Sequence, residues 1–281
     1  MKKFTGVLIA SDVDGTLLNS SHEVSQENRQ ALDYFMSEGG FFTVATGRTR
    51  QTYAIVQQDI TINAPAILCN GALLYDFKKK LLLHTQGLPG GAFNHALVAD
   101  ILKRFPEVTC ECYTLDDLYL TKIFEVSQVH MDYACLNYHD YMPENMPEDW
   151  LKILVTSIDT ALLHTIRDYI NSTYPALTAF MSTRYFLEIL SKGVNKGEGV
   201  LRLANHLGVA MNNVYTVGDE ENDVEMIQVA ACGFATANAV DSVKNAANYI
   251  LPHNDQNAIA ALVCQLDKRY HAAEMLTEQL I

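Results

Sequence analysis

The sequence has no apolar run long enough to span a membrane, and it has few basic residues. A spanning helix needs about 18 or more consecutive apolar residues, and no stretch of the chain provides them. The 20 lysines and arginines are outnumbered by 33 aspartates and glutamates, which gives a formal net charge of −13. Nucleic acids and anionic lipid surfaces repel a chain of this charge. We therefore expect no nucleic-acid partner and no membrane partner, and the sequence carries no signal for an oligomeric state.

Paired metal ligands and a disulfide framework are also missing. The six cysteines show neither the ligand spacing of a zinc site nor the density of a disulfide scaffold. Cys110 and Cys112 are close in sequence, and because positions i and i+2 of a strand share a face, they could bind a soft metal. A zinc site needs a second pair, and none follows, so we interpret both as core residues. The isolated His130 and His139 are interpreted as surface or packing residues.

The first eleven residues are basic and then apolar, like a short signal peptide. Asp12 and Asp14 interrupt the apolar stretch too early for that interpretation. The cysteine pattern agrees with reduced thiols. We therefore expect a cytoplasmic protein.

Strands and helices alternate at both ends of the chain. With 281 residues, 49% of them hydrophobic, the sequence suggests two domains or one large α/β unit. Ser25 is a plausible N-cap for a helix that ends at Gly39-Gly40. The strands that we expect around the helices are 7–11, 41–45, 66–69, 214–217, 233–235 and 249–251, with a hairpin at 72–75 and 81–84. This alternation predicts a Rossmann-like, doubly wound parallel sheet with helices on both faces.

The middle of the chain, from Gln86 to Arg184, has a different pattern. Its expected elements are a helix with apolar residues at 93, 97, 101 and 102, strands at 108–114, 118–120 and 152–158, a helix at 161–172, a strand pair within 177–190 and an irregular stretch at 141–147. We interpret this segment as a separate α+β unit inserted into the parallel-sheet domain. The predicted division is residues 1–85 and 185–281 for the core and 86–184 for the insert.

Polar residues follow three of the expected core strands. Asp12 and Asp14 follow the first, Thr46-Gly47-Arg48 the second, and Gly218-Asp219 with Asn222 and Asp223 a third. Asp and Gly often simply form turns. However, ligands of open parallel sheets bind outside the carboxyl ends of the strands, and Lys196 also precedes a helix near this edge. The joint placement favours a shared site over turns alone.

The residue types at this edge narrow the chemistry. Two unit charges 4 Å apart repel by about 4 kcal/mol at an effective dielectric near 20, so clustered carboxylates call for a cation. An oxygen-only ligand set favours Mg²⁺ over zinc. Lys196 suits a phosphate, and Thr46 and backbone amides can donate hydrogen bonds to it. Because the chain has no glycine-rich phosphate loop, we expect phosphoryl transfer to a side chain, with Asp12 as candidate nucleophile.

The four motifs together resemble those of the haloacid dehalogenase-like phosphatase superfamily. They are DxDGT at 12–16, TGR at 46–48, NKG at 195–197 and GDxxND at 218–223. The inserted unit resembles the large α/β (C2-type) cap of the Cof-type subfamily. The resemblance covers essentially the whole chain, in matched order and spacing.

The resemblance implies a role for each motif residue. Asp12 would attack phosphorus and become an aspartyl-phosphate, and Asp14 would protonate the leaving alcohol and then activate water. Thr46, with the neighbouring Gly47, and Lys196 would hold the phosphoryl oxygens. The expected Mg²⁺ site consists of Asp12, the backbone carbonyl of Asp14, Asp219 and Asp223, the last of which could orient metal-bound waters or Lys196.

Further residues are assigned less directly. The resemblance implies that Asn222 contacts phosphate. Arg48 and Asn70 would lie at the mouth facing the cap, where substrate contact and a surface role are both open. Two departures from the family pattern are Glu220, which adds a charge beside Asp219, and Thr-Ala-Asn-Ala at 236–239, which replaces Met-Gly-Asn-Ala and predicts a loop of different shape.

The implied function is a Mg²⁺-dependent phosphatase of small phosphorylated metabolites, either a sugar phosphate or a phosphorylated cofactor. A phosphomutase is an alternative, because some related enzymes share DxDGT and a similar cap. A non-catalytic phospholigand-binding module is a third. Binding alone needs no paired acid and base carboxylates, which argues against it.

Overall fold

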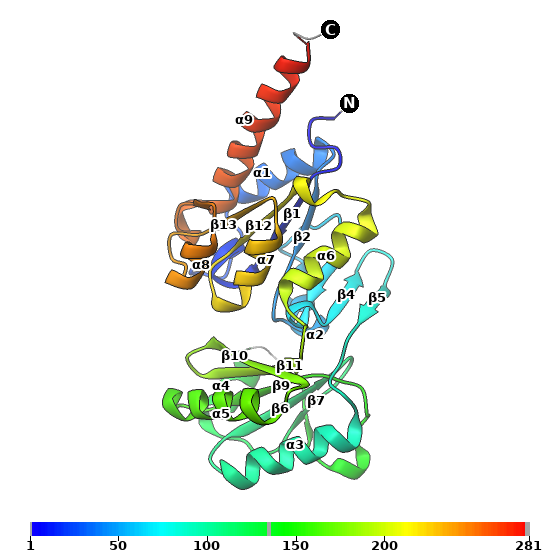
Figure 1. Cartoon of the computed structure of the whole chain (residues 1–281), viewed down its shortest axis with the longest axis vertical. Coiled ribbons are helices and arrows are strands. Elements are labelled where there is room, and N and C mark those ends of the chain that lie inside the picture. The colour runs from blue at the N-terminus through cyan, green and yellow to red at the C-terminus, as the bar shows by residue number, and fades with distance from the viewer. Residues whose placement is uncertain (1, 134–135, 279–281) are drawn as a thin grey trace.

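The computed structural model describes residues 2–133 and 136–278, which form two units (Figure 1). The core unit contains the first and last described residues and occupies the upper half of Figure 1, with the inserted unit below it. Two chain segments connect the units, one after β5 (Leu81–Thr85) and one after β11 (Phe186–Ser191). Within the described residues, no helix combines the length and the hydropathy that a membrane crossing requires.

The core is built on a five-stranded parallel sheet with the strand order β14-β13-β12-β1-β2. Its strands are β1 (Leu8–Ser11), β2 (Phe41–Val44), β12 (Val214–Gly218), β13 (Cys232–Ala235) and β14 (Tyr249–Ile250). A bridge between Ala45 and Ile67 attaches a three-stranded sheet made of β3 (Ala66–Leu68), β4 (Leu73–Asp76) and β5. The predicted parallel sheet and hairpin are confirmed.

Helices cover both faces of the core sheet because successive strand residues point to opposite sides and both sides are apolar. Ile9 packs in one cluster with α1 (Gln26–Ser37) and α9 (Ala258–Glu278). Leu8 packs in another with α6 (Lys196–Leu207) and α7 (Val224–Val229). The core also contains α2 (Arg50–Gln57) and α8 (Asp241–Ala246). Ser25 caps α1 as predicted, accepting a hydrogen bond from the Asn28 amide.

The inserted unit is a six-stranded sheet with the order β10-β11-β9-β6-β7-β8. Its elements are β6 (Thr109–Thr114), β7 (Leu118–Leu120), β8 (His139–Asp140), β9 (Trp150–Thr156), β10 (Leu177–Thr183), α3 (Gly91–Arg104), α4 (Glu125–Tyr133) and α5 (Thr160–Thr173), together with β11. Because β11 pairs with both β9 and β10, the sheet extends past the predicted boundary at residue 184.

Two details of the inserted unit bear on the sequence analysis. Cys110 and Cys112 are fully buried between the sheet and its helices, so their interpretation as core residues is confirmed. Helix α4 was not predicted, because the residues that it buries are Ser127 and Met131 rather than an apolar stripe. The predicted irregular stretch at 141–147 contains one short 3-10 helix, Pro143–Asn145.

The two connecting segments lie against each other. The Ser191 hydroxyl donates to the Gly87 carbonyl at 2.7 Å, and the Leu88 amide donates to the Trp150 carbonyl at 2.7 Å. On the core side, the second segment packs on Gly71, where a Cβ atom would lie 2.1 Å from the Asn195 carbonyl oxygen. The inserted unit therefore begins and ends at neighbouring points of the core.

Candidate active site

The carboxyl ends of three adjacent strands bring the predicted site residues to one edge of the core sheet. Strand β1 lies between β12 and β2, with Ser11 opposite both Val217 and Val44. Asp12 directly follows β1, and Asp219 directly follows β12. Since parallel strands end at the same edge, these residues and Thr46 meet there as predicted.

Lys196 joins this edge from the first turn of α6. Asn195 caps the helix by accepting from the Glu198 amide at 2.8 Å, which fixes the point where Lys196 enters the core. The ammonium group is buried and donates to Asp12 Oδ1 at 2.7 Å and Asp223 Oδ1 at 2.6 Å. Burial lowers the pKa of Lys196, but the two carboxylates outweigh burial and hold the pKa above its usual value. The lysine therefore stays charged.

Three buried carboxylates form one cluster. Asp12, Asp219 and Asp223 each place an oxygen within 4.8 Å of the others. Burial raises the pKa of Asp12 to about 7 and that of Asp219 to about 8, and repulsion from neighbouring carboxylates adds to both shifts. Lys196 supplies only one positive charge against these groups. The all-oxygen donor set and the excess of negative charge fit a hard divalent cation.

Asp223 differs from the other two members of the cluster because both of its oxygens are engaged. Oδ1 accepts from Lys196, and Oδ2 accepts from the backbone amides of Asp219 at 2.9 Å and Glu220 at 3.1 Å. Gly218 leaves room for this carboxylate, since a Cβ there would lie 2.4 Å from Asp223 Cγ. The Asp223 amide in turn donates to the Glu220 backbone carbonyl at 2.8 Å, which closes the turn.

Asp219 is held by the turn that follows β1. Thr16 donates to its Oδ1 at 2.5 Å, and Gly15 approaches it so closely that a Cβ would lie 2.3 Å from Oδ2. Gly15 has φ +77°, a conformation that favours glycine. Asn238, from the 236–239 loop that departs from the family pattern, donates to the Gly15 carbonyl at 2.8 Å. That loop therefore supports the turn, a role that the sequence alone did not indicate.

The Asp14 carboxylate lies apart from the buried cluster and is about half exposed. Arg48 donates to it twice, from Nε at 2.8 Å and from Nη2 at 2.7 Å. Both side chains line the cavity between the units. Arg48 does face the cavity, as predicted, and it also holds the proposed acid/base residue.

Of the two amide side chains assigned to the site, Asn70 takes a different position from the one expected. Asn70 is only 1% exposed and does not lie at the mouth of the site, which corrects the predicted placement. Its Oδ1 accepts from Asn222 Nδ2 at 2.9 Å, and its backbone amide donates to the Thr46 carbonyl at 3.0 Å. Gly47 packs directly over it, since a Cβ there would lie 3.3 Å from the Asn70 amide. Asn70 therefore supports Asn222, which does line the cavity.

The cavity over the carboxylates has a volume of about 500 Å³ and is lined by both units. Its cap side includes residues that the sequence analysis did not single out: Tyr113, Lys152, Leu154, Phe186 and Glu188. His130, interpreted as a packing or surface residue, also lines it and lies against the Phe186 ring. The sequence did contain one signal for this cap surface: Lys152 is a charged residue within the otherwise apolar strand β9.

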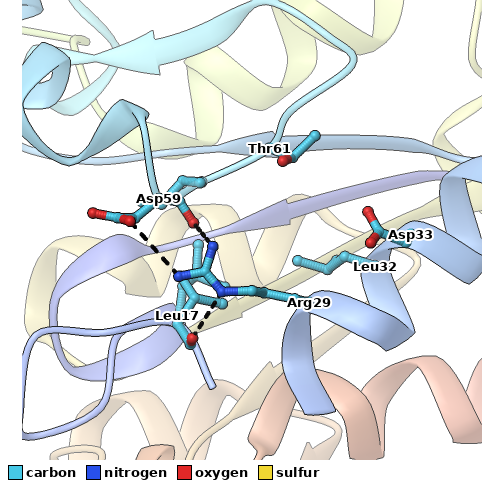
Figure 2. Close-up of a pocket in the computed structure, with 8 residues that line it drawn as sticks. Leu17, Arg29, Leu32, Asp33, Asp59 and Thr61 are labelled. Atoms are coloured by element: carbon cyan, nitrogen blue, oxygen red, sulfur yellow. Dashed lines mark hydrogen bonds and ion pairs between the residues drawn. The ribbon is translucent and has the colours of Figure 1, made fainter. Parts of the chain in front are cut away.

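A second recess, of about 70 Å³, lies elsewhere on the core (Figure 2). Arg29 donates to the Asp59 carbonyl, as a dashed line in Figure 2 shows, and to the Val24 carbonyl. None of the predicted site residues lines this recess. Its one basic side chain is engaged by protein groups, and we assign the recess no ligand.

A doubly wound parallel sheet, an acidic cluster with a buried lysine at its carboxyl edge and a cap over that edge define an enzyme of the α/β class. Residues 9–263 match the model of one such family, the haloacid dehalogenase-like hydrolases. The chain belongs to this family, and the resemblance seen in the sequence is confirmed.

Known relatives and structures agree with this assignment. The chain is 26% identical to the Bacillus subtilis 5-amino-6-(5-phospho-D-ribitylamino)uracil phosphatase YitU, over 90% of this chain and 94% of that protein. It superimposes on a haloacid dehalogenase-like hydrolase from B. subtilis with a TM-score of 0.80 at 26% identity, over 94% of this chain and 99% of that chain. A sugar phosphatase of subclass IIB shares the fold, with a TM-score of 0.80 at 20% identity over 93% and 99% of the chains.

Proposed function

We propose that the chain is a Mg²⁺-dependent phosphatase of small phosphorylated metabolites that works through an aspartyl-phosphate at Asp12. One observation carries the proposal: Lys196 lies 2.7 Å from Asp12 inside a cluster of three buried carboxylates. The names of the relatives support the substrate class. YitU is named for an ester whose phosphate sits on a ribityl chain, and another relative by structure is a sugar phosphatase.

In the first step, an Asp12 oxygen forms a bond to phosphorus while the bond from phosphorus to the leaving oxygen breaks. Lys196 would orient Asp12 and hold a phosphoryl oxygen, and Thr46 and the amides after β2 would hold others. Asp14 would give its proton to the leaving oxygen. In the second step, Asp14 would remove a proton from water, which attacks phosphorus and releases Asp12 and inorganic phosphate.

The carboxylate cluster has the donor set that Mg²⁺ prefers. We assign Asp12, Asp219 and the Asp14 backbone carbonyl to the metal. Asp223 belongs to the predicted metal set, but its two engaged oxygens support a role in orienting Lys196 and the 219–220 amides. When bound, the ion would neutralise the clustered carboxylates and stabilise negative charge on the phosphoryl oxygens.

The inserted unit would decide which leaving group is accepted. The candidate catalytic groups that we name come from the core, whereas eight of the twenty residues that line the cavity come from the cap. Contacts to the non-reacting part of a substrate supply discrimination between substrates. We therefore assign selectivity to the cap and chemistry to the core.

Phosphate release from a panel of sugar phosphates, nucleotides and pyridoxal phosphate, with and without Mg²⁺, tests the proposal. Acid quenching followed by mass spectrometry should detect phosphate on Asp12. Asp12→Asn should abolish both signals while circular dichroism shows an unchanged fold, because an amide cannot attack phosphorus. Release of phosphate without a bisphosphate activator would favour hydrolysis over the phosphomutase alternative. A folded Asp12→Asn protein with ordinary turnover would refute the nucleophile assignment.

A further inference from the structure

One buried lysine of the inserted unit reaches across to the core. Lys152 on β9 is 4% exposed, and its ammonium group donates to the Gly47 carbonyl at 3.0 Å. Within the cap, the same group donates to Glu188 Oε1 at 3.1 Å and lies 2.9 Å from Oε2. Burial lowers the pKa of Lys152, but the attraction of negative groups, chiefly Glu188, outweighs burial and holds the pKa above its usual value. A positive charge of the cap is therefore held against a core peptide.

The stability of the cap does not account for this charge. A buried ion pair loses its hydration, and a well-packed apolar pair of similar volume is often as stable or more stable. The next residues along the two strands, Ile153 and Ile189, point to the opposite face of the cap sheet and use that apolar solution. Lys152 lies on the face that lines the cavity, where the cap meets the core. Its placement indicates a role at the contact between the units.

The loop that Lys152 contacts, residues 46–48, is held at each of its three carbonyl groups. The first carbonyl accepts from the Asn70 amide at 3.0 Å, and the last accepts from the Cys69 amide at 2.9 Å. The Gly47 carbonyl between them accepts from the lysine. The two outer donors are backbone groups of the core, whereas the middle donor is a side chain of the cap. The orientation of the middle peptide therefore depends on the inserted unit.

The peptide between Gly47 and Arg48 connects the lysine to Thr46. This peptide is planar and trans, so its N–H points away from its carbonyl. While the carbonyl accepts from Lys152, the N–H donates to Thr46 Oγ1 at 3.1 Å. The hydroxyl oxygen is the acceptor in this bond, so the hydroxyl hydrogen is directed elsewhere. Thr46 lines the cavity together with Asp12, where that hydrogen can be donated to a phosphoryl oxygen.

We infer that Lys152 is a positioning residue for the phosphoryl group: it fixes and polarises the peptide that follows Gly47, and through that peptide it aims the Thr46 hydroxyl. The inference rests on the proposed function. A cation on the carbonyl makes the N–H of the same peptide a stronger donor, and hydrogen bonds in a chain strengthen one another. Glu188 holds the lysine in place and balances its charge. The cap therefore contributes to the phosphoryl site as well as to selectivity.

This role predicts a loss of activity that does not depend on the leaving group. Removal of Lys152 alone would leave the Glu188 charge buried and unpaired, so the test compares Glu188→Gln with the double variant Glu188→Gln, Lys152→Met. The substrates are acetyl phosphate, phenyl phosphate and glycerol 3-phosphate, with Mg²⁺ present. The kcat/KM of the double variant should be about tenfold lower for all three, because a misdirected donor stabilises the phosphoryl oxygens less well. Losses that differ among the substrates, with none for acetyl phosphate, would indicate a leaving-group contact and overturn the inference.

Inorganic phosphate has no leaving group and provides a second readout. In calorimetric titrations with Mg²⁺, the double variant should bind phosphate about tenfold more weakly than Glu188→Gln does. With Thr46→Val added to both proteins, the loss of the lysine should change binding by less than about twofold, because residues that act through one another are not additive. A full loss in both backgrounds would show that Lys152 does not act through Thr46 and would overturn the inference.

Two further proteins keep the test sharp. Lys152→Met with Glu188→Leu repeats the comparison against wild type with an apolar pair, which should preserve the fold under circular dichroism. Asp116→Ala is the matched control, since Asp116 of the cap pairs with Arg50 of the core and its loss removes a different contact between the units. Both readouts should stay within about twofold of wild type in the control, because an exposed ion pair contributes little. An equal loss in the control would assign the effect to cap docking as a whole and overturn the inference.

The outcomes separate this inference from the proposed function. If the wild-type protein binds phosphate but hydrolyses none of the esters, the proposed function fails, and the phosphate titrations alone decide the inference. If the wild-type protein hydrolyses the esters and the folded double variants keep the parent rates, the inference alone is overturned. A wild-type protein that neither binds phosphate nor hydrolyses any ester overturns both.

Discussion

Arg48 donates two hydrogen bonds to the Asp14 carboxylate, of 2.8 and 2.7 Å, at the entrance to the buried carboxylate cluster. A planar guanidinium can bind both oxygens of a carboxylate at once, and an ammonium group cannot. The pair therefore fixes the direction in which Asp14 faces the cavity.

Replacement of Arg48 should lower activity by releasing Asp14. We expect Arg48→Ala to reduce kcat for an alkyl phosphate by about 10- to 100-fold, because misplacement of an acid/base group forfeits much of its contribution. Arg48→Lys should recover only part of the loss, since it keeps the charge but not the two-point contact. Steady-state kinetics would check this expectation. Equal kcat values for Arg48→Lys and the wild-type protein would show that the positive charge alone, without the two-point contact, is sufficient for activity.

Asp14→Asn should impair turnover through the loss of proton transfer, which typically contributes about 10²- to 10⁴-fold. An aryl leaving group needs little protonation, so formation of the phosphoenzyme from an aryl phosphate should suffer much less than formation from an alkyl phosphate. Single-turnover measurements of enzyme phosphorylation separate the two. Equal losses for both esters would argue against the acid role.

Mg²⁺ should raise the melting temperature, because it relieves the repulsion among the three buried carboxylates. The shift should grow with metal concentration above the dissociation constant, and Asp219→Asn should weaken it. Ca²⁺ should also stabilise the fold but support little turnover, because it takes more ligands at longer distances and could chelate both oxygens of Asp12. Full activity with Ca²⁺ alone would contradict this account.

Gly15→Ala should remove metal binding and activity together. The added Cβ would lie 2.3 Å from Asp219 Oδ2, so the ligand must move. Gly6→Ala is a matched control, since Gly6 has the same φ of +77° and no atom within 4 Å of its Cβ position. The control should cost about 1–2 kcal/mol of stability for the left-handed backbone and leave the Mg²⁺-induced thermal shift intact. A Gly15→Ala protein with a normal shift would refute the steric argument.

Asp100 should stabilise the cap in a pH-dependent way. Partial burial raises the pKa of this carboxyl, but hydrogen bonds from Tyr169, Tyr174 and Arg104 outweigh burial and lower the pKa below its usual 3.8. The contribution to stability is therefore present above the unfolded pKa and is lost as pH falls through the folded one. We expect urea titrations to show Asp100→Asn less stable than wild type at pH 7, with the difference shrinking below pH 4. A constant difference would exclude ionisation as its source.

The sequence was sufficient to locate the catalytic edge because that prediction depends on topology alone. Asp12 and Asp219 follow strands whose parallel pairing brings them together whatever rotamers they adopt. Lys196 could likewise be placed, since a capped helix begins at that residue.

The topology of the sheet does not predict the directions of the side chains or the packing between the two units. The pairing of Arg48 with Asp14 and the burial of Asn70 depend on rotamers and on a left-handed backbone, φ +54°, at Asn70. Lys152 and Glu188 could have been noticed as charges within apolar strands. Their position over the core, however, depends on how the cap docks, which no local pattern encodes.

The close approach of the two connecting segments, tied by the bond from Ser191 to Gly87, makes the cap exchangeable. A unit whose ends emerge side by side can be replaced by another with the same spacing without altering the path of the core chain. Recombination at these two short segments could therefore give the same catalytic edge a different cap. We expect chimaeras joined there, with caps from other members of the family, to inherit the substrate ranking of the cap donor.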